Sequence, residues 1–86
     1  MPDGRVTVLL FGPAREAVGR ATLLWEVPAA GLRADEIVAG LRARYPRLGA
    51  TLTSSRFVRN GRYLASLAIR LRPGDEFAVH PPYGGG

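Results

Sequence analysis

The sequence predicts a single α+β domain in which one main helix covers a mixed β-sheet. The chain has 86 residues, which is the size of one domain. Hydrophobic residues make up 47% of it, enough for one modest core. The apolar patterns follow the order strand, strand, helix, strand, strand. A single long helix among strands favours an α+β architecture, with the helix on one face of the sheet.

The first strand is expected over Arg5–Phe11, because this segment is apolar and β-branched up to a glycine-proline pair. Its continuous apolar character predicts burial on both faces and a central place in the sheet. A short helical turn should follow over Pro13–Val18 and end at Gly19, since proline suits the first helical position and glycine suits the exit. Apolar and polar residues then alternate over Ala21–Val27, which predicts a half-buried second strand.

The main helix is expected over Leu32–Tyr45, where apolar residues recur at helical spacing. Asp35 and Glu36 lie in its predicted first turn and arginines lie in its last, as the helix dipole favours. Pro46 disfavours a helical conformation at the residue before it, so the helix should end at Tyr45. The following residues, Gly49–Ser55, are expected to form a loop.

The second half of the chain is predicted to be β-structure again. Strands over Arg56–Arg59 and Arg62–Leu64 flank Asn60-Gly61, a pair that tolerates the positive φ angles of a tight hairpin. A second turn is expected at Arg72–Asp75, before a last strand over Glu76–His80. This order is typical of a β-grasp domain, in which the first and last strands run parallel at the centre of the sheet.

The composition leaves few side chains for catalysis. The chain contains no cysteine and no lysine, so thiolate and Schiff-base chemistry are excluded, and one histidine, His80, cannot build a metal site. We expect His80 to lie at the rim of the sheet. No apolar run approaches the roughly 18 residues that span a bilayer, and Met1–Arg5 is polar, so no membrane association and a cytoplasmic location are expected.

The end of the sequence is the predicted working part. Residues 1–80 should form the folded domain and residues 81–86 a flexible tail, with two prolines that end strand pairing and three glycines that fit a narrow channel. A glycine-rich end is often only a frayed terminus. Its carboxylate at Gly86 would be ionised and a poor electrophile, so it would need activation by an ATP-dependent partner.

Four segments of the chain carry a family resemblance. They are Phe11–Gly19, Arg56–Gly61, Leu71–Glu76 and Pro81–Gly86. In composition and order they resemble the small, sulfur carrier subunits of molybdopterin synthase, a family of ubiquitin-like β-grasp proteins. The resemblance extends over nearly the whole chain and aligns the tail with the family's Pro-Pro-x-x-Gly-Gly ending.

The resemblance implies a function in molybdenum cofactor biosynthesis. A ubiquitin-activating-like adenylyltransferase would use ATP to activate Gly86, and a sulfur donor protein would supply the sulfur of a thiocarboxylate, 1-thioglycine. The tail would enter the large subunit of a heterotetrameric synthase and donate sulfur to cyclic pyranopterin monophosphate. The inserted residues would be Pro81, Pro82, Tyr83, Gly84, Gly85 and Gly86. We expect no stably bound cofactor, and catalytic side chains in the large subunit.

Four residues of the folded domain are candidates for contact with a partner. Arg15 and Glu16 could bind a partner or pair with each other, and Phe77 could be an interface or a core residue. Phe11 is the fourth candidate.

Other functions share some of these features. The same tail chemistry would serve a carrier for thiamine or tRNA thiolation, or a protein modifier joined through Gly86. Eight arginines and no acidic residue lie between Ile37 and Gly74, which a nucleic-acid face or an interface for an acidic partner would explain. Because these arginines alternate with apolar residues, we expect no nucleic-acid partner.

Overall fold

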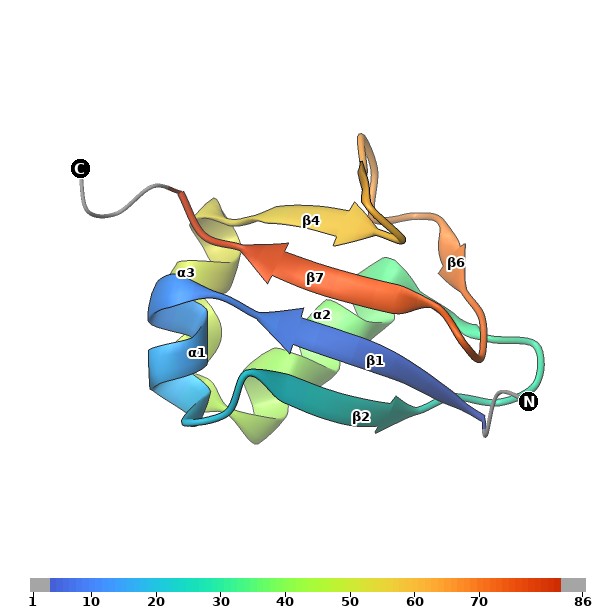
Figure 1. The fold of residues 1–86 in the computed structure, drawn as a ribbon, viewed down its shortest axis with the longest axis horizontal. Coiled ribbons are helices and arrows are strands. Elements are labelled where there is room, and N and C mark those ends of the chain that lie inside the picture. The colour runs from blue at the N-terminus through green and yellow to red at the C-terminus, as the bar shows by residue number, and fades with distance from the viewer. Residues whose placement is uncertain (1–3, 83–86) are drawn as a thin grey trace.

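A computed structural model describes residues 4–82 of the chain, in which helices cover one face of a five-stranded sheet (Figure 1). A second, two-stranded sheet lies beside the first. The elements in chain order are β1 (Arg5–Leu10), α1 (Gly12–Val18), β2 (Thr22–Glu26), β3 (Leu32–Arg33), α2 (Ala34–Arg44), the 3-10 turn η1 (Pro46–Leu48), α3 (Gly49–Ser54), β4 (Arg56–Arg59), β5 (Arg62–Tyr63), β6 (Arg70–Leu71) and β7 (Glu76–His80).

The strand order β2-β1-β7-β4-β5 confirms the predicted β-grasp topology. The first and last strands, β1 and β7, run parallel, with Val8 opposite Phe77 and Leu10 opposite Val79. All other neighbours in this sheet are antiparallel. In Figure 1, β1 and β7 lie side by side with their arrowheads at the same end. The end of β7 is therefore held from both sides, by β1 and by β4.

Burial alternates along β1, so the expectation that both faces of this strand are buried was wrong. Val6, Val8 and Leu10 are fully buried, whereas Thr7 and Leu9 are half-buried. The helices cover only the face to which Val6, Val8 and Leu10 point. The other face of the sheet, which we call the open face, carries Thr7 and Leu9.

The main helix, α2, begins at Ala34 rather than at Leu32 because the two residues before it pair with β6. Its first backbone N–H groups, those of Ala34 and Asp35, donate to the carbonyl oxygens of Ile69 and Leu67. These bonds satisfy donors that a helix leaves without partners in its first turn. The pairing of β3 with β6 was missed because two-residue strands have no periodic pattern.

The segment predicted as a loop after α2 contains the helix α3, so that prediction was wrong. Leu48 and Leu52 lie four residues apart and are almost fully buried, which places both on one face of the turn against the core. The hydroxyls of Thr53 and Ser55 donate to the carbonyl oxygens of Gly49 and Thr51. Burial of two leucines therefore outweighs the weak helix propensity of this segment.

Both predicted turns are present. Asn60 and Gly61 have φ angles of 49° and 85°, the positive values that a two-residue hairpin turn requires. Gly74 has a φ of 96° in the second turn, where the Asp75 N–H donates to the carbonyl oxygen of Arg72. The Asn60 side chain joins the two turns, because its amide donates to Asp75 and its oxygen accepts from the Glu76 N–H.

The core lies between the sheet and the helices. Its fully buried members include Phe77 from β7 and Ile37 and Leu41 from α2. The Phe77 ring stacks on Phe57 of β4, with 5.5 Å between the ring centres. Among residues 4–82, no helix is long and apolar enough to cross a bilayer.

Gly40 is predicted to set the position of Trp25 on α2. A Cβ atom at Gly40 would lie 2.5 Å from the Trp25 ring, and the Arg44 guanidinium lies 4.5 Å from the ring centre. Because the ring must move, Gly40→Ala should lower the free energy of unfolding by about 1 kcal/mol, although alanine is the better helix former by a similar amount. Urea unfolding measures the change.

The control for this prediction uses a smaller side chain at position 25. In a Trp25→Leu background the obstacle is gone, so Gly40→Ala should stabilise the protein by about 0.5 to 1 kcal/mol through helix propensity alone. The same sign of change in both backgrounds would show that the Trp25 ring does not oppose the substitution.

Candidate functional site

The tail begins at the end of β7, in the middle of the sheet. His80 is the last paired residue of this strand and lies opposite Arg56 of β4. Pro81 and Pro82 follow, and because proline has no backbone N–H, strand pairing cannot continue. In Figure 1 the chain leaves the sheet at the end that carries α1 and α3. Tyr83, Gly84, Gly85 and Gly86 lie outside the described residues.

Four side chains from separate elements meet where the tail leaves the sheet. The Phe11 and His80 rings are 4.7 Å apart between centres, and the Tyr63 ring lies 6.1 Å from His80. The Arg56 guanidinium lies 5.8 Å from the centre of the Tyr63 ring. We call Phe11, Tyr63, His80 and Arg56 the aromatic layer. Arginine and aromatic rings attract each other through the ring quadrupole, so these contacts hold the layer together.

The aromatic layer continues into an apolar row across the open face. Leu9, Ala78, Val58 and Tyr63 lie opposite one another on β1, β7, β4 and β5. Ala78 and Val58 are buried and Leu9 is half-buried, so Tyr63 is the exposed member of the row. The exposed large apolar side chains of the described residues are all on this face or at its edge: Phe11 at 44%, Leu24 at 55% and Tyr63 at 63% exposure. Exposed apolar surface gathered on one face marks an interaction site.

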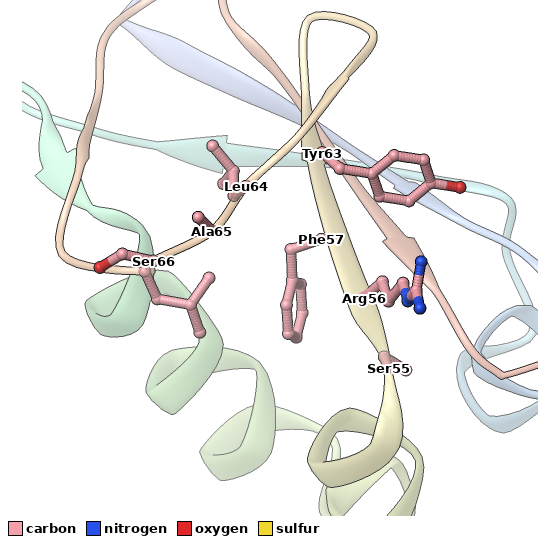
Figure 2. Close-up of a pocket in the computed structure, with 8 residues that line it drawn as sticks. Ser55, Arg56, Phe57, Tyr63, Leu64, Ala65 and Ser66 are labelled. Atoms are coloured by element: carbon pink, nitrogen blue, oxygen red, sulfur yellow. The ribbon is translucent and has the colours of Figure 1, made fainter.

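A pocket of about 360 Å³ lies at the β4–β5 edge of the sheet, and Figure 2 shows the residues that line it. Phe57 lies on the helix side of β4, whereas Arg56 and Tyr63 extend to the opposite side. The other lining residues are Ser55 and the segment 64–67. The pocket has no carboxylate or imidazole in its lining and therefore no general base to activate a serine.

Of the four candidate contact residues, Arg15, Glu16 and Phe11 are exposed and Phe77 is buried. Arg15 and Glu16 are exposed on α1 and border one shallow hollow with Gly12 and Gly19. They form no ion pair with each other, since the one ion pair found in residues 4–82 joins Arg33 to Asp35. Phe11 is exposed in the aromatic layer.

Phe77 is fully buried, so its assignment to a partner-binding surface was wrong. Its side chain points to the helix-covered face, where the ring stacks on Phe57. His80, expected at the rim of the sheet, does lie at the end of β7 and contacts two rings there. The sequence analysis missed Arg56 and Leu24, although alternation along their strands is a signal that could have placed both on the open face.

Charge around the site is positive and mostly without carboxylate partners. The Arg33–Asp35 pair is distant in sequence from the aromatic layer and has a bidentate geometry, at 3.2 Å and 2.8 Å. The hydrogen bond from Arg33, together with its charge, lowers the pKa of the Asp35 carboxyl below its usual value. The Arg56 guanidinium, by contrast, lies over the Tyr63 ring.

The chain is similar in sequence and in fold to proteins named as sulfur carrier subunits and small modifier proteins. The model of the ThiS family matches residues 8–86. A molybdopterin synthase sulfur carrier subunit of Anopheles gambiae is 36% identical over 85 residues, which cover 95% of this chain and 92% of the relative.

Two solved structures share the fold. The crystal structure of SAMP1 from Haloferax volcanii is 27% identical, covers 96% of this chain and 100% of its own, and has a TM-score of 0.78. A complex of subunits 1 and 2 of the molybdopterin-converting factor from Helicobacter pylori contains a chain with 24% identity and a TM-score of 0.68, which covers 95% of this chain and 99% of its own.

Proposed function

The chain belongs to the ThiS family, and we propose that it is the sulfur carrier subunit of a molybdopterin synthase. Relatives that cover nearly its full length have this name. The observation that carries the proposal is the position of Pro81 and Pro82, which we call the tail root. A central strand held on both sides delivers Pro81 and Pro82 beside an exposed aromatic layer, so a partner that docks on that layer is in position to receive the tail.

The proposed chemistry takes place at the carboxylate of Gly86. A carboxylate oxygen attacks the α-phosphorus of ATP in the activating partner, and pyrophosphate leaves. The terminal sulfur of a persulfide on a donor protein then attacks the acyl carbon, AMP leaves, and an acyl disulfide forms between Gly86 and the donor. A thiol reductant cleaves the S–S bond, which releases the donor as its thiol and leaves the thiocarboxylate. Glycines at the tip suit both steps, because a chain without Cβ atoms can enter a narrow active site.

The proposed acceptor is cyclic pyranopterin monophosphate, held by a large subunit. The Helicobacter pylori complex joins subunits 1 and 2 of a molybdopterin-converting factor, which supports a two-subunit arrangement for this chain too. The pocket in Figure 2 has no carboxylate or imidazole in its lining. The catalytic side chains of the proposed reaction belong to the large subunit.

A second candidate function is protein modification through the same tail. Small archaeal modifier proteins from two organisms share this fold with TM-scores of 0.78. A modifier would form an isopeptide bond between Gly86 and a lysine amine of another protein. Since this chain contains no lysine, it could not form lysine-linked polymers of itself.

Reconstitution tests the proposed function. The thiocarboxylated chain should convert cyclic pyranopterin monophosphate to molybdopterin when the large subunit is added, and the unmodified chain should not. Conversion is measured by the fluorescence of the oxidation product of molybdopterin. Absence of conversion, together with isopeptide-linked conjugates of the chain in cell extracts, would favour the modifier instead.

A further inference from the structure

A groove beside the tail root has a recognition chemistry that sulfur transfer does not use. It measures about 410 Å³ and opens where the chain leaves β7. Its lining consists of Ser54, Arg56, Tyr63, His80, Pro81 and Pro82. These residues supply a guanidinium, a phenol, an imidazole and a hydroxyl, and none of them is acidic. Such a set of groups is suited to an anion that also has apolar surroundings.

We propose that this groove binds a carboxylate side chain on the protein that receives the tail, and that Arg56 is the residue that binds it. The inference rests on the proposed function and adds to it the chemistry of the partner's contact surface. The partner should present an aspartate or glutamate beside an apolar patch, placed to enter the groove when that patch covers the aromatic layer.

Arg56 is prepared for such a contact. Of the side chains in residues 4–82, only those of Arg33 and Asp35 form an ion pair, so Arg56 has no carboxylate partner in this part of the chain. Its guanidinium lies over the Tyr63 ring at 5.8 Å, and Figure 2 shows both side chains on the same side of β4. This cation–π contact restricts the arginine before binding, which reduces the entropy lost when the carboxylate is bound.

The surroundings favour a protein partner over a nucleic acid. The groove is lined by the exposed Tyr63 ring beside Arg56, and arginine beside exposed aromatic residues is the composition of a protein interface. A phosphate backbone is bound by several converging cations, whereas this groove offers one arginine and one histidine. The net charge of +5 adds long-range attraction for an acidic surface.

Charge reversal at two positions tests the inference. Arg56→Glu and Arg47→Glu lower the net charge equally, but Arg47 is exposed on η1, in the helix layer and away from the open face. Calorimetric titration with the purified large synthase subunit of the same organism should show at least about 30-fold weaker binding for Arg56→Glu and less than about threefold for Arg47→Glu. The loss should shrink at high salt, and unchanged melting temperatures check the fold.

The outcomes separate this inference from the proposed function. If the unsubstituted chain does not bind the large subunit, the proposed function and the inference both fail. If it binds, and Arg56→Glu binds equally well or both variants are weakened equally, only the inference is overturned. Binding of a single-stranded oligouridine probe that Arg56→Glu abolishes, with subunit affinity unchanged, would instead assign the groove to nucleic acid.

Discussion

Addition of one alanine after Gly86 is expected to abolish sulfur transfer and leave the fold unchanged. The added residue moves the carboxylate away from the glycine tip and places a Cβ atom at the end that must enter the partner's active site. The last strand ends at His80, so the added alanine should not change the free energy of unfolding. Conversion of cyclic pyranopterin monophosphate with the large subunit measures the first effect, and thermal unfolding measures the second.

Two substitutions within the tail provide a matched control. Gly84 occupies a variable position of the motif that the sequence resembles, whereas Gly85 belongs to its final glycine pair. Gly84→Ala should therefore retain most of the activity, and Gly85→Ala should lose it, although both add one methyl group. Equal activity of the two variants, or normal conversion by the extended chain, would contradict a mechanism in which a narrow channel receives the tip.

Gly31→Ala is expected to destabilise the fold strongly. Gly31 is buried with a φ of 85°, and a Cβ atom there would overlap the backbone carbonyl oxygen of Leu71 in β6. A backbone atom paired in a sheet cannot move aside as a side chain can. We expect a loss of about 3 to 5 kcal/mol in the free energy of unfolding, measured by urea denaturation.

Gly19→Ala separates the two causes of this loss. Gly19 has nearly the same φ, 84°, but apart from its two chain neighbours no residue would lie within 4 Å of a Cβ atom there. Gly19→Ala should therefore lower the free energy of unfolding by only about 1 to 2 kcal/mol, the cost of holding an alanine in the left-handed conformation. If the two variants lose the same stability, the contact with Leu71 contributes nothing and the packing described around β6 is wrong.

The long elements of the fold could be predicted because their signals are local. Alternation in β2, helical spacing in α2 and the Asn60-Gly61 pair each depend on neighbours in the sequence. The order of these elements along the chain pointed to a β-grasp domain, and this architecture in turn predicted the parallel pairing of β1 with β7, which the structure confirms. These pairings place the tail at the end of a central strand.

The remaining features depend on contacts between segments distant in sequence. Residues 32–33 and 70–71 pair only because the fold brings them together, and α3 forms because Leu52 has a core to enter. Phe77 and Phe11 looked equivalent as aromatic residues near strands, yet one is fully buried and the other exposed. Alternation along a strand sorts its side chains into two faces, and which of the two the helices cover decides this difference.

The aromatic layer could not be predicted for the same reason. Phe11, Tyr63, His80 and Arg56 belong to four separate parts of the sequence and meet only through the strand order β1-β7-β4-β5. Each residue alone had an ordinary structural explanation. Their convergence beside the tail root is a property of the sheet register.

Intact mass spectrometry of the chain produced together with its activating enzyme and sulfur donor tests the central claim most directly. The account predicts a mature chain that ends at Gly86 and gains the mass of one oxygen-to-sulfur exchange, with the exchange confined to the last residue in fragment spectra. A terminus that stays a plain carboxylate under those conditions, or a mature chain that ends at any other residue, would contradict it.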